Sequence, residues 1–154
     1  MPTVYGYART STDDQEESLE VQKSQIMHEY KYRYSNMTWG GIFTDSDVSG
    51  GIEMRLRPEG GRLCRSVQKG DFVIVTKMDR GFRDTVDMLT QTDAWQKAGV
   101  ALVLMDLHVD TSTAMGEMMM TFAAAMARFE RRRCGERTRD ALRAKMAKGQ
   151  LIGA

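Results

Sequence analysis

The chain has 154 residues, of which 42% are hydrophobic, and its 22 lysines and arginines against 21 aspartates and glutamates give a formal net charge of +1. This composition is typical of a single globular domain and excludes disordered and collagen-like proteins. Apolar runs are too short to cross a bilayer, which takes roughly 20 residues, and the chain begins without a signal segment, so the sequence predicts a cytoplasmic protein.

Short apolar runs rich in β-branched and aromatic residues alternate along the chain with helical patterns. The predicted strands are 3–7, 72–76 and 100–105, and the predicted helices between them are 16–35 and 84–98. Near-continuous apolar strands indicate a sheet buried on both faces, and Asp84 is expected to cap the second helix. We therefore expect an α/β fold with a largely parallel central sheet flanked by helices.

The stretch from 44 to 61 is rich in turn formers and polar residues and shows no periodicity. It predicts a long loop, and long loops inside compact domains are often functional.

From 114 to 149 the sequence lacks proline and predicts one long helix, with cap candidates at 110–113, a stop at Gly149 and a bend at Gly135. Its first half is apolar nearly all round, so we expect its own sheet to cover one side and a second subunit the other. A core helix of a monomer is the alternative. The predicted division is an α/β core at 1–113 and the long helix at 114–149.

The charge is distributed unevenly, which bears on this helix. Residues 1–127 carry 13 basic and 18 acidic side chains, a balance of −5, whereas residues 128–154 carry 9 and 3, a balance of +6. Basic residues on every side of a helix suit a rod lying against a nucleic acid, although a charged tail can also be merely solvated. The predicted DNA-binding residues are Arg131, Arg133, Arg137, Arg139, Lys145 and Lys148.

Two polar clusters follow predicted strands, where open α/β sheets form their active sites. After the first strand, Ser11 can act as a nucleophile with Arg9 stabilising an anionic oxygen, although residues 11–14 also resemble a helix cap. After the strand at 72–76, Arg80 and Arg83 are three residues apart, which places both on one side of a helical turn. Guanidinium groups pair bidentately with phosphate, so these arginines, with Arg57 from the loop, favour a phosphate substrate.

The alternative for the second cluster is a set of surface ion pairs that Asp79 and Asp84 form with the arginines. The sequence does not indicate a metal site. His28 and His108 are the two histidines, and neither they nor Asp45 and Asp47 form a metal-ligand pattern. A Ser-His-Asp hydrolase motif and an ATP-binding phosphate loop are likewise missing from the sequence, so we expect neither a metal nor a cofactor. Two isolated cysteines suggest neither a disulfide nor a zinc site.

Together these motifs resemble the serine recombinases of the resolvase/invertase family over essentially the whole chain. The matching residues are Tyr7 to Thr12 with Gln15, Gln22, Phe43 to Asp45, Ser49, Arg57, Asp79-Arg80, Arg83-Asp84, Gly116 to Met118, Glu130-Arg131 and Glu136-Arg137.

The resemblance implies that Ser11 attacks a DNA phosphodiester to give a 5′-phosphoserine linkage and a free 3′-hydroxyl, and that reversal rejoins exchanged strands. It implies a site without metal or ATP in which four arginines stabilise charge on the phosphate: Arg9, Arg57, Arg80 and Arg83. Gln22, Asp45, Ser49 and Asp79 match active-site positions, and Asp79 is expected to orient groups or transfer a proton.

The resemblance also implies partners. The apolar half of the long helix would form a homodimer interface, the basic half would cross double-stranded DNA on its minor-groove side, and two dimers would form a synaptic tetramer. Relatives continue into a separate DNA-binding domain, so we expect this chain to be a catalytic domain without it, encoded by a bacterium, a mobile element or a phage. The competing hypotheses are a catalytically idle DNA-binding module and a hydrolase of smaller phosphorylated substrates.

Overall fold

A computed structural model of the chain describes residues 1–11 and 18–149, which form two compact units, one of residues 1–120 and one that begins at residue 121. The elements are β1 (Thr3–Arg9), α1 (Leu19–Arg33), β2 (Thr38–Asp45), the short 3-10 helix η1 (Met54–Leu56), α2 (Pro58–Ser66), β3 (Phe72–Val75), α3 (Met78–Gly81), α4 (Thr85–Ala98), β4 (Ala101–Leu104), β5 (Val109–Asp110) and α5 (Ala114–Ala147).

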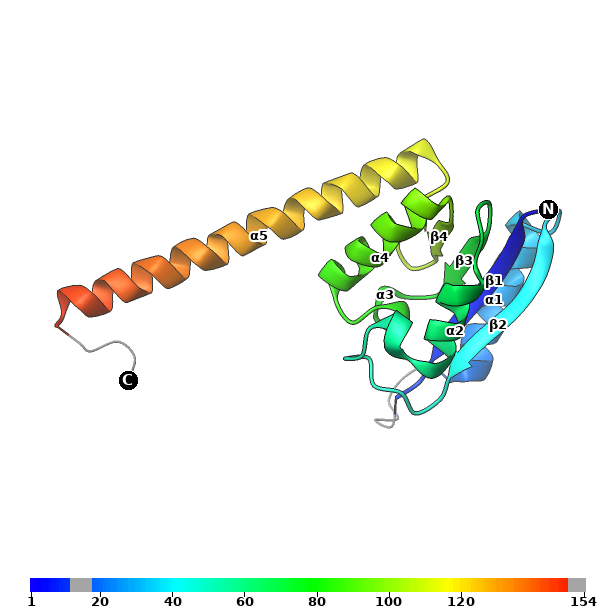
Figure 1. Cartoon of the computed structure of the whole chain (residues 1–154), viewed down its shortest axis with the longest axis horizontal. Coiled ribbons are helices and arrows are strands. Elements are labelled where there is room, and N and C mark those ends of the chain that lie inside the picture. Colours follow the sequence, from blue (N-terminus) through cyan, green and yellow to red (C-terminus); the bar gives the residue numbers. More distant parts are fainter. Residues whose placement is uncertain (12–17, 150–154) are drawn as a thin grey trace. The chain divides into compact units, whose positions relative to one another are not determined.

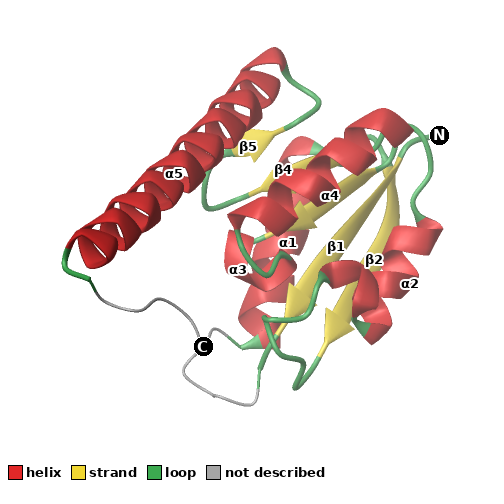
Figure 2. Ribbon diagram, turned by 60° about the vertical axis from the view of Figure 1, so that its left-hand side comes forward, coloured by secondary structure: helices red, strands yellow, loops and turns green. Residues whose placement is uncertain are grey.

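The first unit is built around one five-stranded sheet with the strand order β2-β1-β3-β4-β5. The first four strands in this order are parallel, and β5 pairs antiparallel with β4. Helices lie on both faces of the sheet (Figure 2). The predicted α/β fold is confirmed, and so are its three strands and two helices, which are β1, β3, β4, α1 and α4. Asp84 caps α4 as predicted, because its carboxylate accepts a hydrogen bond from the Asp87 N–H at 2.8 Å.

Alternate residues of β3 enter two separate hydrophobic cores. Val73 and Val75 pack in the core that contains residues of α2 and α4, whereas Ile74 packs on the other face with Ile26 of α1. The central strands are therefore apolar on both sides, which explains their near-continuous apolar sequences.

The predicted loop at 44–61 is wrong in part, because β2 extends to Asp45 and α2 begins at Pro58. Gly60 and Gly61, which we interpreted as turn residues, are buried inside α2. A Cβ atom at Gly60 would collide with the carbonyl oxygen of Met54, and one at Gly61 would lie 2.7 Å from that of Arg55. These glycines thus allow α2 to pack closely against η1.

The predicted long helix is confirmed as α5, which continues without interruption through Gly135 (Figure 1). Thr113, one of the predicted cap residues, accepts a hydrogen bond at Oγ1 from the Gly116 N–H at 3.0 Å. Gly149 follows the helix with a positive φ of 70°, as a glycine stop requires. Within the described residues, we find no helix long and apolar enough to span a membrane.

Candidate functional site

The segment that carries Ser11 is fixed to the end of β2 and to the turn that follows. The Thr10 N–H donates to the carbonyl of Asp45, and the Thr10 carbonyl accepts from the Val48 N–H, both at 3.0 Å. Ser11 is partly buried directly after this pairing. Backbone hydrogen bonds therefore extend the β1–β2 ladder to the residue before the predicted nucleophile. Thr12 and Gln15, which belong to the same motif, lie outside the described residues, as does most of the alternative cap at 11–14.

Arg9 is 3% exposed and connects this segment to α3. Its Nη1 donates to the Val48 carbonyl at 2.8 Å, and its Nη2 donates to the Asp79 carbonyl at 3.0 Å. The side chain of Gln22 on α1 forms two hydrogen bonds with the backbone of Arg9. Its Oε1 accepts from the Arg9 N–H at 3.1 Å, and its Nε2 donates to the Arg9 carbonyl at 2.9 Å. The predicted residues Arg9, Gln22 and Asp79 are thus brought together by direct contacts.

Arg57 is 1% exposed and joins the turn after β2 to α3. Its Nε donates to the Ile52 carbonyl at 2.8 Å, and its Nη1 donates to the Arg80 carbonyl at 2.8 Å and to the Tyr7 hydroxyl at 3.1 Å. The guanidinium group that we predicted to face a phosphate is therefore held by neutral groups inside the protein. Arg57 contributes a buried positive charge at the site, and its hydrogen bonds connect the turn that contains Ile52 to α3.

Asp45 and Tyr7 form a buried pair beside Arg57. The Asp45 carboxylate accepts from the Tyr7 hydroxyl at 2.7 Å and from the N–H groups of Glu59 and Gly60 at 2.9 Å each. It thereby satisfies donors at the amino terminus of α2, where a negative charge is favourable. Burial raises the pKa of Tyr7 far above its ordinary value, and the hydrogen bond to Asp45 acts in the same direction, so the hydroxyl stays protonated and donates.

Tyr7 is a residue of the site for which the sequence predicted no role of its own. The signal was present, because the twofold period of a strand places Tyr7 on the same face as Arg9.

The predicted placement of Arg80 and Arg83 on one helical turn is wrong. α3 ends at Gly81. Phe82 has an extended backbone conformation, and its side chain is buried in the core. As a result Arg80 is 4% exposed, whereas the side chain of Arg83 is 45% exposed.

Ion pairs occur at this cluster, as the alternative interpretation proposed. Arg80 Nε lies 3.8 Å from an oxygen of Asp79, whose side chain is 67% exposed. Arg83 lies 3.9 Å from Asp84 and 3.4 Å from Glu53, an acid that sequence reasoning missed. Ser49 is exposed and accepts from the Gly51 N–H at 3.1 Å, which stabilises the turn after β2.

Neither cysteine forms a disulfide, and no group of three or more His, Cys, Asp or Glu side chains in residues 1–11 and 18–149 could hold a metal ion. Burial raises the pKa of the Cys64 thiol to about 11, whereas Cys134 is exposed on α5.

Helix α5, whose residues from 121 onward belong to the second unit, carries exposed apolar and basic side chains. The large apolar residues of α5 with exposures of 41 to 68% in its first half are Met115, Met118, Met119, Phe122, Met126 and Phe129. One helix cannot bury such residues against itself, and a large exposed apolar surface marks an interaction site. The homodimer stays a prediction.

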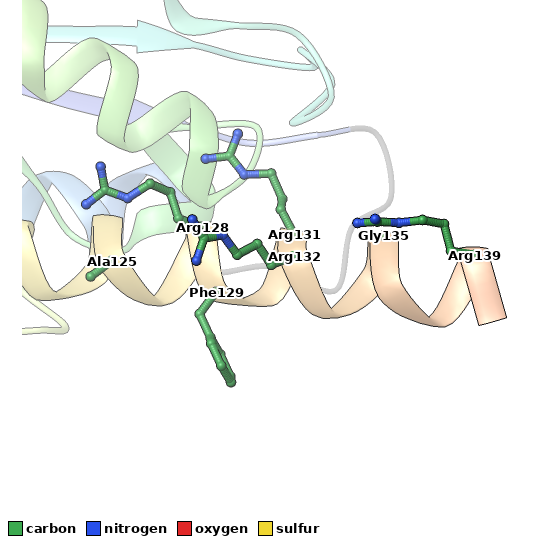
Figure 3. Close-up of a pocket in the computed structure, with 7 residues that line it drawn as sticks. All are labelled: Ala125, Arg128, Phe129, Arg131, Arg132, Gly135 and Arg139. Carbon is green, nitrogen blue, oxygen red and sulfur yellow. The ribbon is translucent and has the colours of Figure 1, made fainter.

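All six predicted DNA-binding residues are exposed, five of them on α5 and Lys148 just after its end. Between two of them, Arg131 and Arg139, the missing side chain of Gly135 leaves a hollow on one face of the helix (Figure 3). The residues that line this hollow are Ala125, Arg128, Phe129, Arg131, Arg132, Gly135 and Arg139. Four of these seven residues are arginines, which suits an anionic ligand.

Comparisons with known proteins identify similar chains along almost the whole sequence. The profile of the family described as "Resolvase, N terminal domain" matches residues 4–151. The chain is 39% identical over 151 residues to "Resolvase/recombinase" of Pseudomonas putida, covering 97% of the chain and 77% of that protein. It is 36% identical to "Transposon Tn3 resolvase" of Escherichia coli, covering 97% and 75%. Among solved structures, a resolvase family site-specific recombinase from Streptococcus pneumoniae aligns with a TM-score of 0.71 at 29% identity, covering 96% of this chain and 99% of that one.

Proposed function

The chain belongs to the resolvase family of serine recombinases, and we propose from this premise that it supports site-specific DNA recombination with Ser11 as the nucleophile. The observation that carries the proposal is the position of Ser11, directly after the paired Thr10 and two residues after the buried Arg9. The exposed basic helix supports double-stranded DNA as the substrate.

In the proposed reaction, Ser11 Oγ attacks a backbone phosphorus of DNA and loses its proton. The bond from phosphorus to the 3′ oxygen breaks, the 3′ oxygen takes up a proton, and the 5′ phosphate remains attached to the serine. After strand exchange, a 3′-hydroxyl attacks the phosphoserine and releases Ser11. Because the number of phosphoester bonds is unchanged at each step, the reaction needs no ATP and no added nucleophile.

Charge on the transferred phosphate is the main demand on the protein, because phosphoryl transfer depends largely on positioning and electrostatic stabilisation. Arg9, Arg57 and Arg80 are buried, and contacts to the backbone fix the first two, so they provide a preorganised positive potential. The proposed mechanism therefore runs without a metal ion. We assign to the exposed Asp79 carboxylate the orienting or proton-transfer role, because the Asp79 backbone is tied to Arg9.

The long helix supports the assembly part of the proposal. Its apolar first half would pair with a second copy of the chain, and its basic half would contact DNA phosphates. Two such dimers would form the tetramer that exchanges strands.

The test is to incubate the protein with supercoiled DNA that carries its recombination site and to look for covalent adducts on denaturing gels. We expect protein attached at 5′ ends, no adduct with Ser11→Ala, and an unchanged yield with Ser66→Ala, a control serine on α2 whose hydroxyl donates to the Arg62 carbonyl. Adducts that persist in Ser11→Ala would refute the assignment. Loss of cleavage on chelation of divalent metal would refute the metal-free mechanism.

A further inference from the structure

Arg55 and Arg83 share a single carboxylate at the edge of the site. We propose that these two arginines form a second binding site for a DNA phosphate, next to the one that is cleaved, and that Glu53 occupies this site in the DNA-free protein. Arg83, which the family resemblance implied at the cleaved phosphate, is thereby assigned to the neighbouring one, because its side chain is 45% exposed and pairs with Glu53. The proposal rests on the proposed function for the identity of its ligand.

The contacts of Glu53 are those of a phosphate mimic. One carboxylate oxygen lies 2.8 Å from Arg55 Nε, and the other lies 3.4 Å from Arg83 Nη2. The two arginines belong to segments 28 positions apart, one in η1 and one after α3. Planar guanidinium groups bind carboxylate and phosphate oxygens with the same geometry, so a DNA phosphate can take the place of the carboxylate.

Exposure separates this pair from the other arginines of the site. The side chains of Arg55 and Arg83 are 65% and 45% exposed, whereas Arg9, Arg57 and Arg80 are at most 4% exposed. A DNA strand can therefore reach Arg55 and Arg83 without any opening of the core.

The backbone on both sides of Glu53 fixes where its carboxylate lies. The Ile52 carbonyl accepts the hydrogen bond from Arg57 Nε at 2.8 Å, and the Met54 side chain is 1% exposed in the core. Glu53 is thus presented to the arginines by an ordered turn. Asp84 forms a longer pair with Arg83, at 3.9 Å from its Nε, and the Asp87 carboxylate accepts from the Arg83 backbone N–H at 2.8 Å. Binding of DNA must displace Glu53, which then repels the incoming phosphate, so this residue lowers the affinity for DNA.

The test measures equilibrium binding of a fluorescent duplex that carries the recombination site, in a Ser11→Ala background so that cleavage does not contribute. We expect Glu53→Gln to tighten binding about two- to fivefold, the range that an exposed ion pair allows. The matched control is Glu59→Gln, which removes the same charge from an exposed pair with Arg62 at 3.1 Å on α2. Arg55→Gln and Arg83→Gln should each weaken binding and reduce the slope of log K against log salt by about 0.9, the value for one lost phosphate contact.

Two results would overturn the proposal. One is a gain from Glu53→Gln no larger than that from Glu59→Gln. The other is a gain from Glu53→Gln that persists when Arg55 and Arg83 are both replaced by glutamine, because it would then be a general effect of charge. The binding test is independent of cleavage: if wild-type protein binds but forms no covalent adduct, the proposed function fails while the second phosphate site stands.

Discussion

Replacing Asp45 should lower the free energy of unfolding of the first unit, because this carboxylate accepts hydrogen bonds from three donors. In Asp45→Ala, the Tyr7 hydroxyl and the buried Gly60 N–H lose their acceptor, while the Glu59 N–H is only partly buried. A buried donor without a partner costs about 1–3 kcal/mol, and loss of a helix cap costs about 1 kcal/mol. For two such donors and the cap we therefore expect a loss of about 3–7 kcal/mol from a total stability of about 5–15 kcal/mol.

Urea unfolding, followed by tryptophan fluorescence, measures this loss. With a slope of about 1–3 kcal/mol per molar urea, Asp45→Ala should move the midpoint down by at least about 1 M. Asp45→Asn keeps one acceptor oxygen and should lose less than the alanine variant. The control Asp93→Ala removes an exposed acid that pairs with Lys97 and should change stability by less than about 1 kcal/mol. An Asp45→Ala protein as stable as the control would show that these hydrogen bonds do not hold the site together.

Three further predictions concern single side chains. Because the pKa of Tyr7 is raised in the folded state, the folded protein keeps a proton that the unfolded chain releases near pH 10. The contribution of Tyr7 to stability is therefore complete below pH 10 and is lost as the pH rises above it, so Tm should fall there. In Tyr7→Phe, Tm should fall less steeply over the same pH range. Iodoacetamide at pH 8 should label the exposed Cys134 but not Cys64, whose pKa is raised to about 11. Bound DNA should protect Cys134 from labelling. Peptide mass spectrometry measures both effects. Gly60→Ala should cost about 1–3 kcal/mol in urea unfolding through overpacking against Met54, whereas Gly51→Ala, with its nearest atom at 3.5 Å, should cost much less.

The sequence predicted strands correctly where both faces of the strand are buried. Continuous apolar runs such as 72–76 identify central parallel strands, because such strands must be apolar on both faces. β2 could not be predicted in this way, because it is an edge strand, half-exposed and interrupted by Gly40 and Gly41. Gly40 is needed because a Cβ there would collide with the ring of Tyr5, a contact between strands that no local pattern reveals.

For the site, the sequence predicted some of the residues that lie in contact, such as Arg9, Gln22 and Asp79, but not how each is used. Arg57 contacts Ile52 five positions away and Arg80 23 positions away, and both acceptors are backbone carbonyls, which carry no signal in the sequence. The same holds for Asp45, whose partners at the start of α2 are backbone N–H groups. Long-range hydrogen bonds to the backbone therefore determined the roles that residue type alone left open.

Under the proposed function, the environment of Arg57 explains how a chain with an acidic body attracts DNA at this edge. Among the described residues, no carboxylate forms an ion pair with Arg57, and the guanidinium is solvated by carbonyls and by Tyr7 instead. The Asp45 carboxylate is linked to Arg57 through the Tyr7 hydroxyl, which lies between them in the hydrogen-bond chain. Burying a charge without a counter-ion costs stability, but the uncompensated charge acts more strongly in a medium of low dielectric than in water. Under the proposed function, the phosphate of the substrate is the counter-ion that the protein itself does not provide.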